Sequence, residues 1–291
     1  MDVSNQRINS IHESEGTNRG LTVFGLKVMA LVTMFIDHVG AIIIPCIQSH
    51  VTSPQLFAML EGLMTIMRLI GRISFPIFAF LIVNGFYHTR NRKKYVLRLG
   101  IFALISEPFF DLASSSSWMN FSHQNVFFTL CLGLVTIWGY DSLIKQQKSP
   151  VIGGLLVLFT SIVAFCLGTD YDAYGILMIF IMYLFFFNRQ KMCLMVILLN
   201  GLIYGPYLFS SFIDQAFVEA YYGLTLTGGW KVYLQIMLYL QSIAQLFCVV
   251  ALWPISKYRG EKGSDRINKY FFYAFYPVHL FILGMVSWII G

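Results

Sequence analysis

Long apolar runs alternate with short polar connections along most of the chain. Nine runs can be marked, and each has roughly the 20 residues that an α-helix needs to cross about 30 Å of hydrocarbon. They are residues 25–47, 63–88, 95–112, 124–142, 150–168, 173–188, 191–212, 232–253 and 270–290. The pattern predicts an all-α fold, a polytopic integral membrane helical bundle with about nine transmembrane helices.

The composition also indicates a membrane protein. Of the 291 residues, 57% are hydrophobic and only 12% are charged, and the mean hydropathy is +0.68. A soluble domain of this size would need more polar surface. Residues 1–20 are polar and predict a disordered cytoplasmic arm. Residues 21–291 predict a single transmembrane domain, because no connection is long enough to fold into a soluble module.

Most Lys and Arg residues lie in every second connection between the apolar runs. The largest clusters fall at 90–98 and 257–269, while the intervening connections carry acidic residues such as Asp170 and Asp172. Because positively charged connections stay on the cytoplasmic side, the pattern predicts a cytoplasmic N-terminus and an external C-terminus. The net charge of +6 is therefore a topology signal, and no nucleic-acid partner is expected.

An adjacent acid and histidine, Asp37 and His38, lie in the middle of the first apolar run. Titratable side chains at this depth are costly and usually functional. Lys27 precedes His38 by almost three helical turns, so the two share one helix face. Asp37 points about 100° away from His38, which predicts a partner for Asp37 on another helix.

Later runs carry further polar groups within the predicted membrane. Arg72 in the second run needs a counter-ion, and Asp37 and Glu107 are the candidates. His279 lies at mid-depth in the last run. A second buried histidine favours a site that handles protons.

Several strings of residues, in their order and spacing, resemble the TraX family. They are GLKVMALVTMFIDHVGA, RLIGRISFPIFAFLIVNGFYHTRNRKKYVLRL, ISEPFFD, QNVFFTLCLGL and FYPVHL, and the resemblance runs from about Leu21 to the C-terminus. The best-known member of that family is implicated in N-terminal acetylation of conjugative pilin. The resemblance therefore implies an acetyl-CoA-dependent acetyltransferase in the cytoplasmic (inner) membrane of a bacterium, with a pilin as a candidate acceptor.

The histidine of the first run and the final FYPVH string also resemble, more loosely, transmembrane acyltransferases that modify sugars and glycans. In that group the first-helix histidine is considered a catalytic base, and acyl-CoA enters from the cytoplasm. Their usual Asp and Arg near the start of the first span are not matched here, where Lys27 is the only charge. The wider resemblance implies a cell-surface glycan as a second class of acceptor.

A mechanism follows as a hypothesis, with acetyl-CoA as co-substrate and no metal. Its phosphates would bind at the basic cytoplasmic rim, and its thioester would lie near His38, the general base. Asp37 would pair with Arg72, and Glu107 or His279 would orient the acceptor or His38. The candidate binding residues are Lys27, Arg90, Arg92, Lys93, Lys94 and Arg98 for acetyl-CoA, and His123 and Asn125 for the acceptor.

Two other functions fit the same residues. Buried His, Asp and Glu side chains with Pro-broken helices also suit a proton-coupled transporter or exporter, although no inverted repeat is visible. The charged groups could instead form a structural network in a non-enzymatic assembly protein of a membrane complex. Acetyl-CoA binding would separate the enzyme from both alternatives, and substrate-dependent proton flux would identify a transporter. Membrane lipid is a partner in all three cases.

Overall fold

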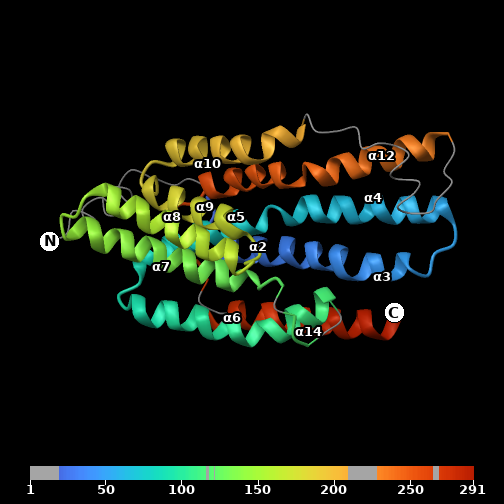
Figure 1. The fold of residues 1–291 in the computed structure, drawn as a ribbon, viewed down its shortest axis with the longest axis horizontal. Coiled ribbons are helices and arrows are strands. Elements are labelled where there is room, and N and C mark those ends of the chain that lie inside the picture. The colour runs from blue at the N-terminus through green and yellow to red at the C-terminus, as the bar shows by residue number, and fades with distance from the viewer. Residues whose placement is uncertain (1–19, 116–117, 121, 209–227, 265–268) are drawn as a thin grey trace.

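The computed structural model describes residues 20–115, 118–120, 122–208, 228–264 and 269–291, and every regular element in these ranges is a helix (Figure 1). The predicted all-α fold is confirmed. The arm predicted for residues 1–20 lies outside the described residues, apart from Gly20. The elements are α2 (Val23–His38), η1 (Val39–Ile43), α3 (Ile44–Gln48), α4 (Pro54–Gly71), α5 (Ser74–His88), α6 (Arg92–Ser115), α7 (Val126–Lys145), α8 (Pro150–Cys166), α9 (Asp172–Leu184), α10 (Arg189–Tyr204), η2 (Gly205–Leu208), α12 (Gly229–Ser242), η3 (Ala244–Ala251), α13 (Leu252–Ser256) and α14 (Lys269–Ile290).

Several helices begin where a short polar side chain accepts a hydrogen bond from a free backbone N–H. Thr22, Ser53 and Asn125 cap α2, α4 and α7 in this way. Each cap satisfies one of the N–H groups that a helix start leaves without a partner. The Ser53 cap and the proline after it start α4 at residue 54. The start predicted from hydropathy, residue 63, was therefore wrong, because that run is only the apolar part of a longer helix.

Five helical stretches are long and apolar enough to cross a membrane, and a bent pair, Gly229–Ser242 with Ala244–Ser256, brings the count to six if it forms one span. The five are Val23–Gln48, Pro54–His88, Val126–Lys145, Arg189–Leu208 and Tyr270–Ile290. Two predicted spans correspond to shorter apolar helices, α8 with 17 residues and α9 with 13. The described residues thus support a multi-span membrane protein, and the count of nine stays a prediction.

The outward faces of several helices are apolar. On α8, Leu155, Phe159 and Phe165 are 59%, 63% and 69% exposed, and Leu202 on α10 is 79% exposed. Contiguous apolar surface of this kind is rare in water. These faces therefore contact lipid, and the chain is a membrane-embedded protein.

Four connections lie at one end of the bundle, which we call the basic end: residues 89–91, 146–149, 185–188 and 257–264. Contacts between charged and polar groups join the helices there. Arg92 Nη1 donates to Asp141 Oδ2 at 2.8 Å, which links α6 to α7, and Arg189 Nη1 donates to the Ile255 carbonyl at 2.9 Å, which links α10 to α13. The α3–α4 connection and the C-terminus lie toward the other end (Figure 1).

The helices differ in how far they reach from the basic end. Figure 1 shows α3, α4 and α12 extending beyond α7, α8 and α9. The connections α6–α7 and α8–α9 therefore lie partway along the longer helical stretches. A backbone bridge between Gln124 and Thr169 joins the two connections. This arrangement brings Asp170 and Tyr171 beside α2, where they line a cavity together with His38.

Candidate active site

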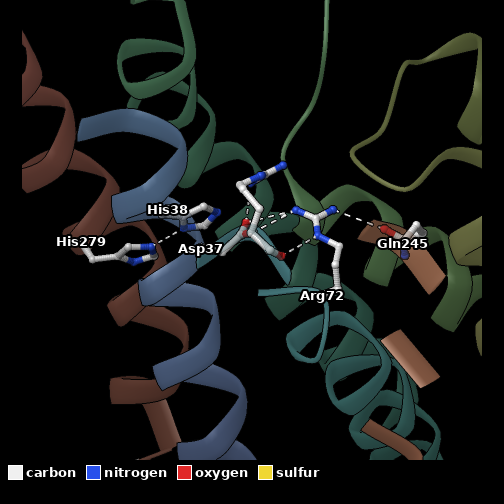
Figure 2. Close-up of polar contacts among 6 residues, drawn as sticks. Asp37, His38, Arg72, Gln245 and His279 are labelled. Atoms are coloured by element: carbon white, nitrogen blue, oxygen red, sulfur yellow. Dashed lines mark hydrogen bonds and ion pairs between the residues drawn. The ribbon is translucent and has the colours of Figure 1, made fainter. Parts of the chain in front are cut away.

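Asp37 and His38 are the last two residues of α2, and a π-helical turn follows at Val39–Ile43. Such turns occur frequently at functional sites. Because α2 contacts both α4 and α14, two neighbouring side chains can reach different helices. His38 points toward α14, and Asp37 points toward the α4–α5 junction (Figure 2).

The half-buried His38 and the buried His279 are in direct contact. His38 Nδ1 lies 2.6 Å from His279 Nε2, and the two rings stack with centroids 4.9 Å apart. His279 Nδ1 lies 2.7 Å from the carbonyl oxygen of Phe275. Since a carbonyl only accepts hydrogen bonds, His279 Nδ1 carries the hydrogen, and Nε2 of the neutral ring accepts.

This direction of hydrogen bonding determines the tautomer of His38. His38 Nδ1 must donate to His279 Nε2, so the lone pair of the neutral His38 ring is on Nε2. Among the described residues, the hydrogen bond of the His38 ring is the one through Nδ1, and Nε2 makes none. The nitrogen that can act as a base is therefore available to a ligand.

Asp37 holds two guanidinium groups. Its Oδ2 accepts from Arg68 Nη1 at 2.7 Å, and its Oδ1 accepts from Arg72 Nη2 at 3.1 Å. The structure thus confirms the predicted pairing with Arg72 and adds Arg68 as a second partner. A methyl group at Gly71 would overlap the Asp37 carboxylate. The close approach of α2 and α4, on which this buried ion pair depends, therefore requires glycine at position 71.

Arg72 also connects this ion pair to a second polar network. Its Nη1 donates to Gln245 Oε1 on η3 at 3.3 Å (Figure 2), and Gln245 Nε2 donates to the Tyr174 hydroxyl at 3.4 Å. The Tyr174 hydroxyl donates in turn to Asn200 Oδ1 at 2.8 Å. The network ties α9, α10 and η3 to the α4–α5 junction and restrains the guanidinium of Arg72.

Two cavities meet beside His38. The first has a volume of about 250 Å³, lies toward the basic end, and is lined by Lys27, Arg98 and many apolar side chains. The second, of about 280 Å³, is lined by His38 and by the ion pairs of Asp37. Four residues line both cavities: Met34, Phe78, Val126 and Tyr276. Because the two spaces share these lining side chains, they are adjacent, and a ligand that extends past them from the first cavity would arrive at His38.

A third cavity, of about 330 Å³, shares Arg72, Asp170 and Tyr171 with the second. The Tyr171 ring stacks on Phe75 with centroids 3.6 Å apart. The Asp170 side chain is exposed, but protein surrounds its position. The reduced solvation raises the pKa of Asp170 to about 6, although Arg72 acts in the opposite direction. This carboxyl group therefore titrates near neutral pH beside the His38 cavity.

Comparison with known proteins identifies the family. The sequence profile of the TraX protein matches residues 24–287. The chain belongs to the TraX family. It is similar to the "Probable fimbrial assembly protein FimC, serogroup H1" of Dichelobacter nodosus, with 26% identity over 278 residues that cover 91% of this chain and 96% of that protein. No solved structure matches.

In this TraX protein, the predicted donor-binding residues do not all lie at the first cavity. Lys27 and Arg98 line it. Arg92 instead pairs with Asp141. The other three are exposed and line neither of the first two cavities: Arg90, Lys93 and Lys94. The structure therefore concentrates the positive charge at this cavity on α2 and α6.

Three other predicted site residues, Glu107, His123 and Asn125, are absent from the linings of the first two cavities. Glu107 Oε2 accepts from the backbone N and the side-chain Nδ2 of Asn125, at 3.1 and 2.5 Å. Asn125 also caps α7 and donates to the Ala103 carbonyl, so its polar atoms join α6 to α7. His123 is exposed.

The structure adds site residues that the sequence did not single out. Tyr276 belongs to an aromatic string, YFFYAFY, and no feature of the sequence distinguishes it from the other aromatic residues there. Tyr276 precedes His279 by three residues, so the two lie on the same helix face. This spacing was the signal from which Tyr276 could have been predicted as a site residue. Asp170 and Tyr171 follow α8 in a connection expected at the external surface, and hydropathy alone does not show that this connection reaches the histidine site.

Proposed function

We propose that this protein is a membrane-embedded acetyltransferase that moves an acetyl group from acetyl-CoA to an amine or hydroxyl of an acceptor. The observation that carries the proposal is that two cavities meet beside His38, whose Nε2 is left free by the hydrogen bond to His279. One cavity would receive the donor from the basic end, and the other would receive the acceptor. A base between two separate binding spaces is what acyl transfer requires.

The first cavity suits the donor chemically. Lys27 and Arg98 supply positive charge for phosphate groups. The apolar side chains deeper in the cavity suit the uncharged arm that carries the thioester. The basic end would face the cytoplasm, where positively charged connections remain. A topology of nine spans, with α8 and α9 as short crossings, would then place the C-terminus outside.

The chemistry uses His38 twice. Its Nε2 would take a proton from the acceptor while the acceptor nitrogen or oxygen bonds to the carbonyl carbon. The carbon–sulfur bond would then break, and the same proton would pass from His38 to the sulfur, giving the acetylated acceptor and the free thiol. His279 would hold the ring in one orientation and would still accept from Nδ1 when His38 is protonated.

The acceptor is proposed from the relative and the family. The relative from Dichelobacter nodosus is named as a fimbrial assembly protein, which supports an acceptor in pilus or fimbrial assembly, such as the N-terminus of a pilin. A peptide amine could reach the second cavity past Asp170, whose carboxylate would attract the ammonium form. The ammonium group would lose one proton to water before the neutral amine reacts. A hydroxyl of a cell-surface glycan is the second class of acceptor.

The decisive test compares the wild-type protein with a His38→Ala variant in detergent. Both should bind acetyl-CoA with similar affinity in calorimetry, because His38 is not among the residues that line the first cavity. Transfer of labelled acetyl to a panel of peptide amines and glycan hydroxyls should fall by about 10²- to 10⁴-fold in the variant, which is the usual contribution of a general base.

Each contrary outcome has a separate meaning. Undiminished transfer by the His38→Ala variant would exclude His38 as the base. Absence of acetyl-CoA binding to folded wild-type protein would favour the transporter or the assembly protein instead. Proton flux into vesicles that contain the purified protein would then distinguish these two.

A further inference from the structure

Tyr276 lies where the two cavities meet. It is one of the four side chains that line both of them, and only 3% of its surface is exposed. Its ring is edge-on to the rings of His38 and His279, with centroid distances of 5.8 and 5.6 Å. On its other side it packs edge-on against Phe127, at 5.2 Å. The ring is therefore fixed beside the proposed base.

The Tyr276 hydroxyl is buried and has no hydrogen-bond partner among the described residues. The backbone N–H of Val126 lies close enough to interact with the phenol oxygen but is not in hydrogen-bond geometry. Even a bond from that N–H would leave the hydroxyl hydrogen without an acceptor. Buried hydroxyl groups are normally paired, and an unpaired one destabilises the fold. Phenylalanine could make the same ring contacts without this cost.

A helix start adds to the polarity of the junction. The 20-residue helix α7 begins at Val126, which lines both cavities. The N-terminal end of a helix carries partial positive charge and stabilises negative charge nearby. An unpaired donor and a helix start thus lie together beside His38, as required for a site at which negative charge develops.

We infer that the Tyr276 hydroxyl is a catalytic residue that donates a hydrogen bond to the carbonyl oxygen of the acyl thioester. The inference rests on the proposed acetyl transfer. As the acceptor bonds to the carbonyl carbon, the π electron pair of the carbonyl moves onto its oxygen, which Tyr276 stabilises. When that pair returns, the carbon–sulfur bond breaks with its electrons on sulfur, and His38 gives sulfur the proton taken from the acceptor.

A Tyr276→Phe variant tests the role of the hydroxyl and keeps the ring. The expected result is a fall in kcat of about 100-fold, as for loss of one oxyanion donor, with a much smaller change in the Kd for acetyl-CoA, because the hydrogen bond strengthens as negative charge develops on the oxygen. Tyr140→Phe is the matched control, because Tyr140 lines neither cavity and its loss of a hydroxyl should leave kcat unchanged. Thermal unfolding in detergent checks that each variant is folded.

A second measurement needs no turnover. Acetyl-CoA labelled with ¹³C at the carbonyl is bound to the His38→Ala variant, and its carbonyl resonance is compared with that of the free compound. A hydrogen bond to the carbonyl should move the resonance downfield, and the shift should disappear in the His38→Ala, Tyr276→Phe double variant. A single His38→Ala protein that binds the compound without any shift would overturn the inference, even if the double variant failed to fold.

The outcomes separate this inference from the function on which it rests. Full activity of Tyr276→Phe, together with loss of transfer in His38→Ala, would overturn the role of Tyr276 and leave the acetyltransferase proposal intact. Failure of folded wild-type protein to bind acetyl-CoA would overturn both. A loss of kcat much larger than the change in donor affinity, together with the carbonyl shift, would support the role of Tyr276 as the donor to the oxyanion.

Discussion

Asp37 and His38 are adjacent in sequence, but each depends on a different neighbouring helix. His38 is held by His279 on α14, whereas Asp37 is held by Arg68 and Arg72 at the end of α4. One carboxylate facing two guanidinium groups leaves an excess of positive charge, which the carboxylate of Asp170, in the lining of the same cavity, offsets when it is ionised. Charges in apolar surroundings require such compensation. We therefore expect substitutions at Asp37 to affect packing and substitutions at His38 to affect chemistry.

Gly71 tests how strongly the site depends on the contact between α2 and α4. In a Gly71→Ala variant, the added methyl would overlap the Asp37 carboxylate and push it away from both arginines. We expect a destabilisation of about 1–3 kcal/mol, typical of overpacking, and a loss of acetyl transfer larger than the loss of donor binding. Thermal unfolding in detergent and the transfer assay measure the two effects.

The matched control is Gly201→Ala, because a methyl at Gly201 on α10 meets no atom within 4 Å. Alanine stabilises a helix interior relative to glycine by about 0.5–1 kcal/mol, so this variant should be as stable as the wild type or slightly more so. A Gly71→Ala protein that behaved like Gly201→Ala would show that α2 and α4 can separate without damage to the site.

At the scale of elements, the site forms because short and long helices are combined. The continuous helical stretches Val23–Gln48 and Pro54–His88, of 26 and 35 residues, supply the ion pair. The helices α7 and α9 begin partway along them and bring Val126 and Tyr171 to the cavities. α14 adds His279 and, one turn earlier, Tyr276. The position of the site along the bundle is therefore determined by where two short connections lie, and not by any single helix.

Apolar periodicity predicted that most of these helices exist, because hydrocarbon-spanning segments need little beyond length and composition. It also found His38 and His279, since titratable groups are conspicuous in apolar runs. It did not predict which helices are neighbours, because packing between membrane helices depends on shape and small residues. Tyr276 and Asp170 were missed for this reason. The role predicted for Glu107, to orient the acceptor or His38, stays a prediction.

The positively charged side chains of Lys27 on α2 and Arg98 on α6 line the first cavity, and their effect on acetyl-CoA binding can be predicted. A Lys27→Ala, Arg98→Ala double variant should bind acetyl-CoA at least 10-fold more weakly, because each lost charge-assisted contact contributes about 1.5–3 kcal/mol. The Lys93→Ala, Lys94→Ala double variant removes the same charge from exposed positions outside the cavity and should bind almost normally. Calorimetry at one ionic strength compares them, and equal weakening would indicate that only overall charge attracts the donor.

At the scale of the whole molecule, the two ends of the bundle differ in charge. Three of the four connections at the basic end carry Lys or Arg residues, among them Lys148 and Lys257, and the donor cavity lies toward the same end. The proposed reaction depends on this end facing the cytoplasm, since acetyl-CoA must enter there. Orientation and function can therefore be tested together.

Cysteine accessibility gives that test, in a background in which the five native cysteines are replaced. One variant carries Lys148→Cys in the α7–α8 connection at the basic end, and its matched partner carries Thr52→Cys in the α3–α4 connection; both positions are exposed. A membrane-impermeant maleimide applied to intact spheroplasts should label Thr52→Cys and spare Lys148→Cys until the membrane is disrupted, because positively charged connections stay inside. The reverse labelling would place the donor cavity on the side without acetyl-CoA, and the acetyltransferase proposal would then fail whatever the chemistry of His38.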